Sequence, residues 1–485
     1  MSEQSIGKTE SSSFRRAAAR VYHTLKDPGY YKPKYKILIV SDSFSKGGLE
    51  THIYSLYSKL KEDHDFYFAF NSFDSSFDIP SDRIYTGFHF GWNESTDEFC
   101  EDVDRLVQIV ECFGIDVINV HPFYAIFPSI FASNITRTKL VYTYHGIISA
   151  NFTQLINDTV LFEYAFESSV GKVLAVSRSG IDTFKTFNYH NVVLFPNGID
   201  SSLYVESRIN FNKTWCIFSR LDQDNAADIK RFFEYLPKLE IDKIDIYGDG
   251  SYRETLESYV KEHGLNVEFL GYSDKLFEVL KDKYTGCIGI SRSAMEGVCM
   301  NYPVILIGRG KVVGAIDDEI FDAARDYNFV PENLPEISSE RLAAQVKEIN
   351  SGSVRKYRHR SKFIRDHDIL QIADRYIDEL SDIRMIPQTN LVRMYEEIEK
   401  MRGTEDGYFK FFYSRKVYDL LKKYVEWYSG NVFIKNLFAV KNMMNNVEDG
   451  MGYQYYALRD EIRKKDEEIN ALKKELEEIS KKNES

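Results

Sequence analysis

Short apolar runs recur along this 485-residue chain, and each is followed by a polar or glycine-containing segment and then by residues with helical spacing. Such runs are typical of parallel strands whose two faces are both buried. Parallel strands need long crossover connections, which the helical segments between them supply. The order therefore predicts a doubly wound α/β fold. We expect strands at residues 36–41, 65–70, 117–120, 140–144, 173–176 and 192–195, and again at 215–219, 243–247, 267–270, 287–290 and 304–307.

The alternation pauses once, after a turn at residues 196–200, and then starts again. A chain of this length also exceeds what one hydrophobic core usually supports. We therefore expect two Rossmann-like domains with flanking segments. The predicted parts are a polar and basic tail at 1–35, an N-terminal domain at 36–205, a C-terminal domain at 206–385, a helical extension at 386–450 and a coiled coil at 451–485.

Composition excludes several classes of protein. The net charge of −12 argues against a general nucleic-acid binder. The five cysteines are scattered without metal-ligand spacing, which favours free thiols in a reducing compartment and predicts no metal site. The sequence contains no apolar run long enough to span a membrane and no cleavable signal pattern. We therefore expect a cytoplasmic protein, soluble or peripheral to the inner face of the membrane.

The two flanking segments each allow two interpretations. Residues 14–25 carry three arginines among apolar residues, so this segment is either a helix on an anionic membrane surface or a helix that is solvated or packed on a domain. Residues 458–479 place apolar side chains, with Lys465 as the one charged member, alternately four and three positions apart. That spacing predicts a short coiled coil, and hence a homodimer or a partner helix, although a single charged helix is the alternative.

Candidate site residues follow the predicted strands. Gly47 and Gly48 come after the first strand, His121 follows the third, and His145 follows the fourth. Because ligands of open α/β sheets bind at the carboxyl ends of the strands, these residues should gather at one edge. A single histidine after a strand is more often structural than catalytic, but two at one edge favour a functional role for His145.

Residues 291–303 read as a loop, a short helix and the start of a buried strand. Unpaired N–H groups at a helix start favour an anion, so Ser291 and Ser293 would form an anion cradle. Arg292 adds a fork of donors suited to phosphate, and Glu296, one turn later, could accept hydrogen bonds from a ribose diol. The set suits a sugar nucleotide. An ordinary crossover connection is the alternative.

Eight short motifs together resemble one known family. They resemble the retaining glycosyltransferases of the GT-B fold, of the family-four type that uses nucleotide-diphosphate sugars. The resemblance covers roughly residues 36–380 and implies two Rossmann-like domains facing a cleft, with the acceptor on the first and the nucleotide sugar on the second. The motifs are Gly47-Gly48-Leu49-Glu50, Tyr144-His145-Gly146, Ala175-Val176-Ser177, Pro196-Asn197-Gly198-Ile199-Asp200, Ser219-Arg220-Leu221-Asp222, Tyr247-Gly248-Asp249-Gly250, Phe269-Leu270-Gly271-Tyr272 and the stretch 291–303.

The resemblance implies a role for each matching residue. Arg220 would neutralise the leaving diphosphate, on which negative charge grows as the glycosidic bond breaks. His145 would lie beside the transferred sugar, and Glu296 would bind the ribose hydroxyls. The backbone of Gly47 and Gly48 would contact the diphosphate and the sugar. The backbone near Tyr272 would contact the base. The donor is a substrate, and neither a cofactor nor a metal is expected.

Two positions depart from the family pattern. The lysine expected five residues after the arginine is Asn225, and the glutamate expected eight residues before Glu296 is Ile288. We hypothesise that Arg292 replaces the missing lysine. The leading prediction is therefore sugar transfer, with retention of configuration, to a glycan or lipid-linked acceptor in polysaccharide or glycoconjugate synthesis. The alternative is a catalytically degenerate protein that scaffolds partners through its C-terminal helix.

Overall fold

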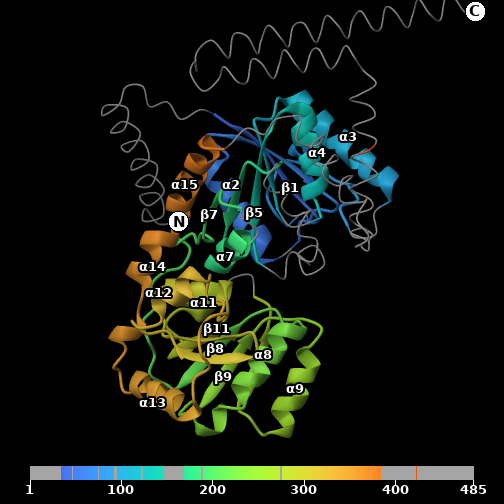
Figure 1. The fold of residues 1–485 in the computed structure, drawn as a ribbon. Helices are drawn as coiled ribbons and strands as arrows, with labels where there is room; N and C mark the ends of the chain where they lie inside the picture. The colour runs from blue at the N-terminus through green and yellow to red at the C-terminus, as the bar shows by residue number, and fades with distance from the viewer. Residues whose placement is uncertain are drawn as a thin grey trace, which may run out of the picture. The chain divides into compact units, whose positions relative to one another are not determined.

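A computed structural model describes residues 34–383, apart from 46, 75, 92–94, 122–123, 147–168, 187–188 and 274–275, together with Lys422. The chain divides into two compact units, Met1–Met385 and Ile386–Ser485. Figure 1 shows the first unit as two sheets, each with its own helices. The predictions for the tail at 1–35, except its last two residues, the extension at 386–450, except Lys422, and the coiled coil at 451–485 lie outside the described residues.

The first sheet is wholly parallel in the described residues and has the strand order β3-β2-β1-β4-β5-β6-β7. Its order doubles back at β1, as the doubly wound prediction requires. The strands are β1 (Lys36–Ser41), β2 (Asp65–Phe70), β3 (Ile84–Tyr85), β4 (Val117–Val120), β5 (Lys139–Tyr144), β6 (Lys172–Ala175) and β7 (Val192–Leu194). The helices between them are α2 (Gly48–Leu60), α3 (Thr96–Phe113), α4 (Ile126–Thr136) and α7 (Arg178–Thr186).

The second sheet has the order β10-β9-β8-β11-β12-β13 and also doubles back, here at β8. Its strands are β8 (Thr214–Phe218), β9 (Lys243–Tyr247), β10 (Val267–Gly271), β11 (Gly286–Gly289), β12 (Val304–Gly308) and β13 (Lys311–Ala315). Its α-helices are α8 (Gln223–Phe233), α9 (Arg253–Glu262), α10 (Leu276–Leu280), α11 (Arg292–Cys299), α12 (Phe321–Asp326), α13 (Ser339–Asn350) and α14 (Arg360–His367).

The strand β13 was not predicted, and it runs antiparallel to β12. The two strands are joined by Arg309 and Gly310, both with positive φ (54° and 71°). Two positive φ angles make the tight turn that joins antiparallel strands. The predicted alternation of strands and helices contains no such hairpin, because each strand in it is followed by a helix.

Local chemistry explains where the helices begin and end. Helix α3 starts with a capping box, in which the Ser95 hydroxyl accepts the N–H of Glu98 and the Glu98 carboxylate accepts the N–H of Ser95. It ends at Gly114, whose φ of 62° suits glycine. Between these ends, Val103, Leu106 and Val110 are buried.

After α14 the chain returns to the first sheet. Helix α15 (Ile369–Ser381) packs into the core of the first sheet, and the Asn119 side chain donates to the Tyr376 hydroxyl at 2.7 Å. Where the chain crosses over, Ile199 and Asp368 form a parallel bridge, so the outgoing and returning segments lie side by side. Residues 340–380 thus close the second domain and cross back to the first.

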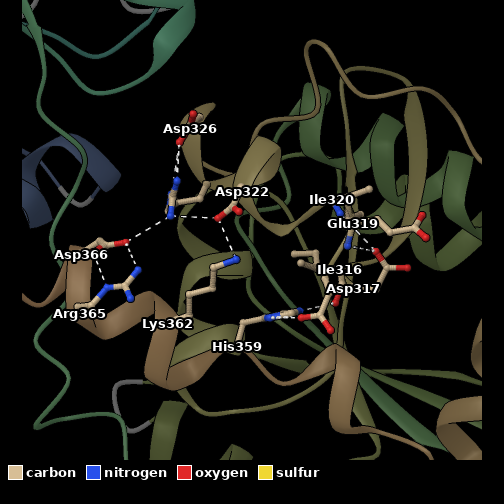
Figure 2. Close-up of polar contacts among 12 residues, drawn as sticks. Ile316, Asp317, Glu319, Ile320, Asp322, Asp326, His359, Lys362, Arg365 and Asp366 are labelled. Atoms are coloured by element: carbon tan, nitrogen blue, oxygen red, sulfur yellow. Dashed lines mark hydrogen bonds and ion pairs between the residues drawn. The ribbon is translucent and has the colours of Figure 1, made fainter.

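Helices α12 and α14 are joined by a dense polar network on the second domain (Figure 2). Arg325 binds three carboxylates, those of Asp322, Asp326 and Asp366, at 3.1–3.3 Å. Lys362 adds a second cation to Asp322 at 3.0 Å. The network fixes α12 against α14 just before the returning segment.

Two further expectations concern thiols and membranes. The five cysteines are free, and Cys216, Cys287 and Cys299 are buried whereas Cys112 is exposed. Among the described helices, none combines the length and apolar composition that a membrane span requires.

Candidate functional site

Three histidines meet at the carboxyl edge of the first sheet. His121 follows β4 and His145 follows β5, and the Nδ1 of His121 lies 3.0 Å from the Nε2 of His145. His52, on the second turn of α2, lies edge-on to His145 with 5.6 Å between ring centroids. The topology therefore brings His121 and His145 together as predicted, and it adds His52.

All three imidazoles are neutral near pH 7. Burial lowers the pKa of His145 to about 4. Burial also lowers the pKa of His52 and of His121 well below the usual range, and the neighbouring histidines add to both effects. Neutral imidazoles can donate and accept hydrogen bonds, so the cluster can bind an oxygen without adding charge.

The second sheet contributes Arg292 to this region. Its Nε donates to the Glu296 carboxylate at 2.9 Å, and its Nη1 donates to the Gly198 carbonyl at 3.0 Å. The charge of Arg292 also contributes to the lowered pKa of His52, after burial and His145. The entrance of α11 therefore faces the histidines of the first domain.

Glu296 is engaged within the protein. Its Oε1 accepts from Arg292 and also from the Tyr204 hydroxyl at 2.8 Å. Burial raises the pKa of Tyr204 well above the usual range, and the Glu296 charge adds to this. Tyr204 and Arg292 thus hold the carboxylate in one orientation, a positioning that the sequence pattern did not predict.

Arg220 lies in the loop after β8 and stays accessible, with 71% of its side chain exposed and Asp222 at 3.5 Å. Its charge reaches the first domain, because it lowers the pKa of Glu50, which burial raises. Asn225, at the position of the expected lysine, donates to the Arg220 carbonyl at 3.1 Å and to Asp222 at 3.3 Å. Position 225 therefore supports the Arg220 loop and supplies no charge.

The glycine loop before α2 contains a carboxylate of its own. A Cβ on Gly47 would collide with the Glu50 carboxylate, which folds back over the loop, whereas a Cβ on Gly48 would meet no atom within 4 Å among the described residues. Because this contact is with the flexible end of the Glu50 side chain, it does not by itself require glycine at position 47. This loop therefore places a carboxyl group, that of Glu50, beside the start of α2.

The remaining predicted residues lie at the ends of β10 and β11. Ser293 uses its hydroxyl within the turn, with the Ile290 N–H donating to it at 3.1 Å. Ser291 has a φ of 49°, unusual for a side-chain-bearing residue, and its N–H donates to the Phe329 carbonyl at 2.8 Å. Tyr272, just after β10, is 63% exposed. Ile288, at the position of the expected glutamate, is fully buried in the core.

Sequence reasoning missed His52, Glu50, Tyr204 and Asp42 as site residues. Asp42 follows β1 and accepts the Ala125 N–H at 3.0 Å, and burial raises its pKa to about 7. His52 had a visible signal, because a histidine stands on the otherwise apolar face of α2. Among the described residues, no group of three His, Cys, Asp or Glu side chains could hold a metal ion.

The architecture matches known structures at low identity. Anabaena HepE, solved in complex with UDP and glucose, is 18% identical, with 72% of this chain and 100% of that chain covered and a TM-score of 0.55. The lipopolysaccharide outer core galactosyltransferase WaaB is 14% identical, with 71% and 99% covered and a TM-score of 0.53. Sucrose-phosphate synthase from Thermosynechococcus elongatus is 13% identical, with 76% and 100% covered and a TM-score of 0.54. The fold is therefore GT-B, as predicted.

One segment of the chain also matches a family by sequence. Residues 46–203, which carry the glycine loop and the three histidines, match the model described as Glycosyltransferase Family 4. No curated protein matches the chain significantly. The chain thus has the GT-B fold, and residues 46–203 are similar in sequence to the family 4 glycosyltransferases.

Proposed function

We propose that this protein is a retaining glycosyltransferase. It transfers a sugar from a nucleotide-diphosphate sugar to a glycan or lipid-linked acceptor in polysaccharide or glycoconjugate synthesis. The family match of residues 46–203 and the GT-B fold support this class. The solved relatives HepE, in complex with UDP and glucose, and WaaB, a galactosyltransferase, make UDP-sugars the first donors to try.

One observation carries the proposal. Arg292 of the second domain donates to the Gly198 carbonyl at 3.0 Å, and the charges of Arg292 and Arg220 lower the pKa of His52 and of Glu50 at the carboxyl edge of the first domain. Cations at this junction can offset the charge that grows on a leaving diphosphate. His145 lies beside them as a neutral hydrogen-bonding group for the sugar.

Ligand-dependent melting tests the binding step. A donor at about 100 times its dissociation constant should stabilise the protein by about 2.7 kcal/mol, which raises the melting temperature measurably. The panel would pair UDP, GDP and ADP with their glucose, galactose and N-acetylglucosamine derivatives. A panel that produces no shift and no sugar transfer would contradict the proposal.

Arginine variants test the assignment of charge. Arg220→Ala should weaken donor binding and lower turnover, and Arg292→Lys should retain more activity than Arg292→Ala because it keeps the charge. Arg341→Ala is the matched control, since Arg341 is 67% exposed and pairs only with the exposed Glu319 in the described residues. Equal donor affinity and turnover in Arg220→Ala and Arg341→Ala would remove Arg220 from the site.

Several finer parts of the proposal need separate tests. The anomeric configuration of the product, measured by NMR coupling constants, tests retention. Turnover that survives EDTA would support a reaction without a metal, with arginines carrying the charge. Membrane fractionation tests a cytoplasmic location with peripheral contact, and the native mass tests a dimer or partner through residues 458–479.

Specific observations favour the alternative of a degenerate scaffold. The core position Ile288 and the uncharged Asn225 remove two polar contacts that the family resemblance implies. In addition, Arg292 is already paired with Glu296. A protein that binds partners but neither melts higher with any donor nor transfers sugar would fit this second function.

A further inference from the structure

The hydrogen bond between His121 and His145 raises the question of which ring carries the shared proton. The two nitrogens lie 3.0 Å apart, and the ring centroids are 5.3 Å apart. His121 is 1% exposed, and its backbone N–H donates to the Val40 carbonyl at 2.7 Å, which holds it at the end of β4. One nitrogen of the pair must donate and the other must accept.

The burial of the second nitrogen of His121 distinguishes the two arrangements. If His145 donates, the proton of His121 stands on Nε2, which is buried and has no hydrogen-bond partner among the described residues. If His121 donates, its Nε2 carries only a lone pair. A buried N–H without an acceptor is rarer in proteins than an acceptor with an unused lone pair. The second arrangement is therefore favoured.

The proton of His145 then stands on Nδ1. His145 is only partly buried, and among the described residues its Nδ1 makes no hydrogen bond. His52 packs edge-on against this ring at an interplanar angle of 71° and so limits its rotation. With the ring held on two sides, the position of the proton decides what His145 offers to a ligand.

We propose that His121 is a positioning residue for His145. It donates its Nδ1–H to the Nε2 of His145 and so holds that ring in the Nδ1–H tautomer. The Nδ1–H of His145 is then the donor that the bound substrate meets. The use of this donor rests on the proposed function. The Nδ1–H can donate to an acceptor oxygen of the transferred sugar or of the phosphate, whereas an unprotonated Nδ1 could not. Neutral imidazole in water prefers the opposite tautomer, so the arrangement needs His121.

Nuclear magnetic resonance of the full chain reports the tautomer directly. The protein would be labelled with 15N in its histidine rings, and long-range 1H–15N spectra would be recorded near pH 7.5. The His145 signals would be identified by their loss in His145→Gln. We expect a protonated Nδ1 and an unprotonated Nε2. The reverse pattern, or two protonated nitrogens, overturns the inference.

Two variants separate positioning from packing. His121→Asn can place its amide nitrogen near the former Nδ1 and donate to His145, so the Nδ1–H tautomer should remain. His121→Phe removes the donor, and His145 should shift toward the Nε2–H tautomer. The exposed His190→Phe is the control and should change nothing. A His121→Phe protein that keeps the Nδ1–H tautomer would show that His121 does not set it.

Activity provides a second readout. Transfer should fall about tenfold or more in His121→Phe, the effect of one hydrogen bond in the transition state, and should be largely restored in His121→Asn. The spectra need neither donor nor acceptor. If His121→Phe fails to fold, the wild-type and His121→Asn spectra still decide. An inactive protein with the expected tautomer contradicts only the proposed function, and an active protein with the reverse tautomer contradicts only this inference.

Discussion

At the scale of single residues, His52 is the least expected feature of the site. It is fully buried, and neither ring nitrogen has a hydrogen-bond partner among the described residues. An unpaired buried polar group costs about 1–3 kcal/mol. The unpaired ring of His52 therefore lowers the free energy of unfolding, while it places an imidazole near His145 and within the electrostatic influence of Arg292.

His52→Leu tests this cost and its pH dependence. At pH 7.5 the variant should be as stable as the wild type or more stable by about 1 kcal/mol, because the unpaired nitrogens are gone. The wild type should lose stability as the pH falls below about 6.5, since the unfolded histidine takes up a proton there and the folded one does not. His52→Leu should lose less over the same range. Urea unfolding at pH 7.5 and pH 5 measures both.

The exposed His190 provides the control for this comparison. His190→Leu should leave the pH dependence of stability unchanged, because the His190 side chain is exposed to solvent. A His52→Leu protein with the acid sensitivity of the wild type would mean that His52 is not the protonating group.

At the scale of single elements, the junction of β11 and α11 depends on a glycine. A Cβ on Gly289 would lie 2.8 Å from the Ser293 Oγ and 2.9 Å from the Ala294 nitrogen. Gly289→Ala should therefore cost about 1–3 kcal/mol through overpacking. Gly48→Ala, which meets no atom within 4 Å among the described residues, should be neutral or slightly stabilising. If Gly289→Ala and Gly48→Ala unfolded at the same denaturant midpoint, this account would be wrong.

The returning helix α15 is tied to the first sheet by a buried lysine. Lys172 on β6 is 2% exposed, and its Nζ donates to Glu379 at 3.0 Å and to Asp382 at 3.2 Å. Lys172→Met keeps the aliphatic volume but removes these bonds, so it should cost about 1–3 kcal/mol. Amide hydrogen exchange in α15 should become faster.

A surface ion pair gives the matched control for Lys172. Lys238 and Glu340 lie 3.0 Å apart but are 59% and 74% exposed. Lys238→Met should change stability by less than about 1 kcal/mol, because exposed pairs contribute little. If both lysine variants leave α15 equally protected, then apolar packing alone holds this helix.

At the scale of the whole first unit, ion pairs join the two domains. Arg178 on α7 binds Asp326 on α12 at 3.2 Å, and Asp326 is labelled in Figure 2 as part of the Arg325 network. A double-mutant cycle with Arg178→Ala and Asp326→Ala should give a coupling free energy of about 0.2–1 kcal/mol in low salt. The coupling should shrink at high ionic strength, since half of the Arg178 side chain is exposed. No coupling at low salt would mean that the two side chains do not pair in solution.

The sequence by itself determined the parallel strands, because a strand buried on both faces requires a continuous apolar run whatever surrounds it. It also placed His121 and His145 at one edge, since parallel strands end on the same side. The tertiary structure alone decided that His52 joins them, that Tyr204 donates to Glu296, and that the charge of Arg220 acts on Glu50. These interactions join residues far apart in sequence, such as His52 with His145 and Tyr204 with Glu296. No local pattern encodes the packing of two separately formed domains, which is what brings such side chains together.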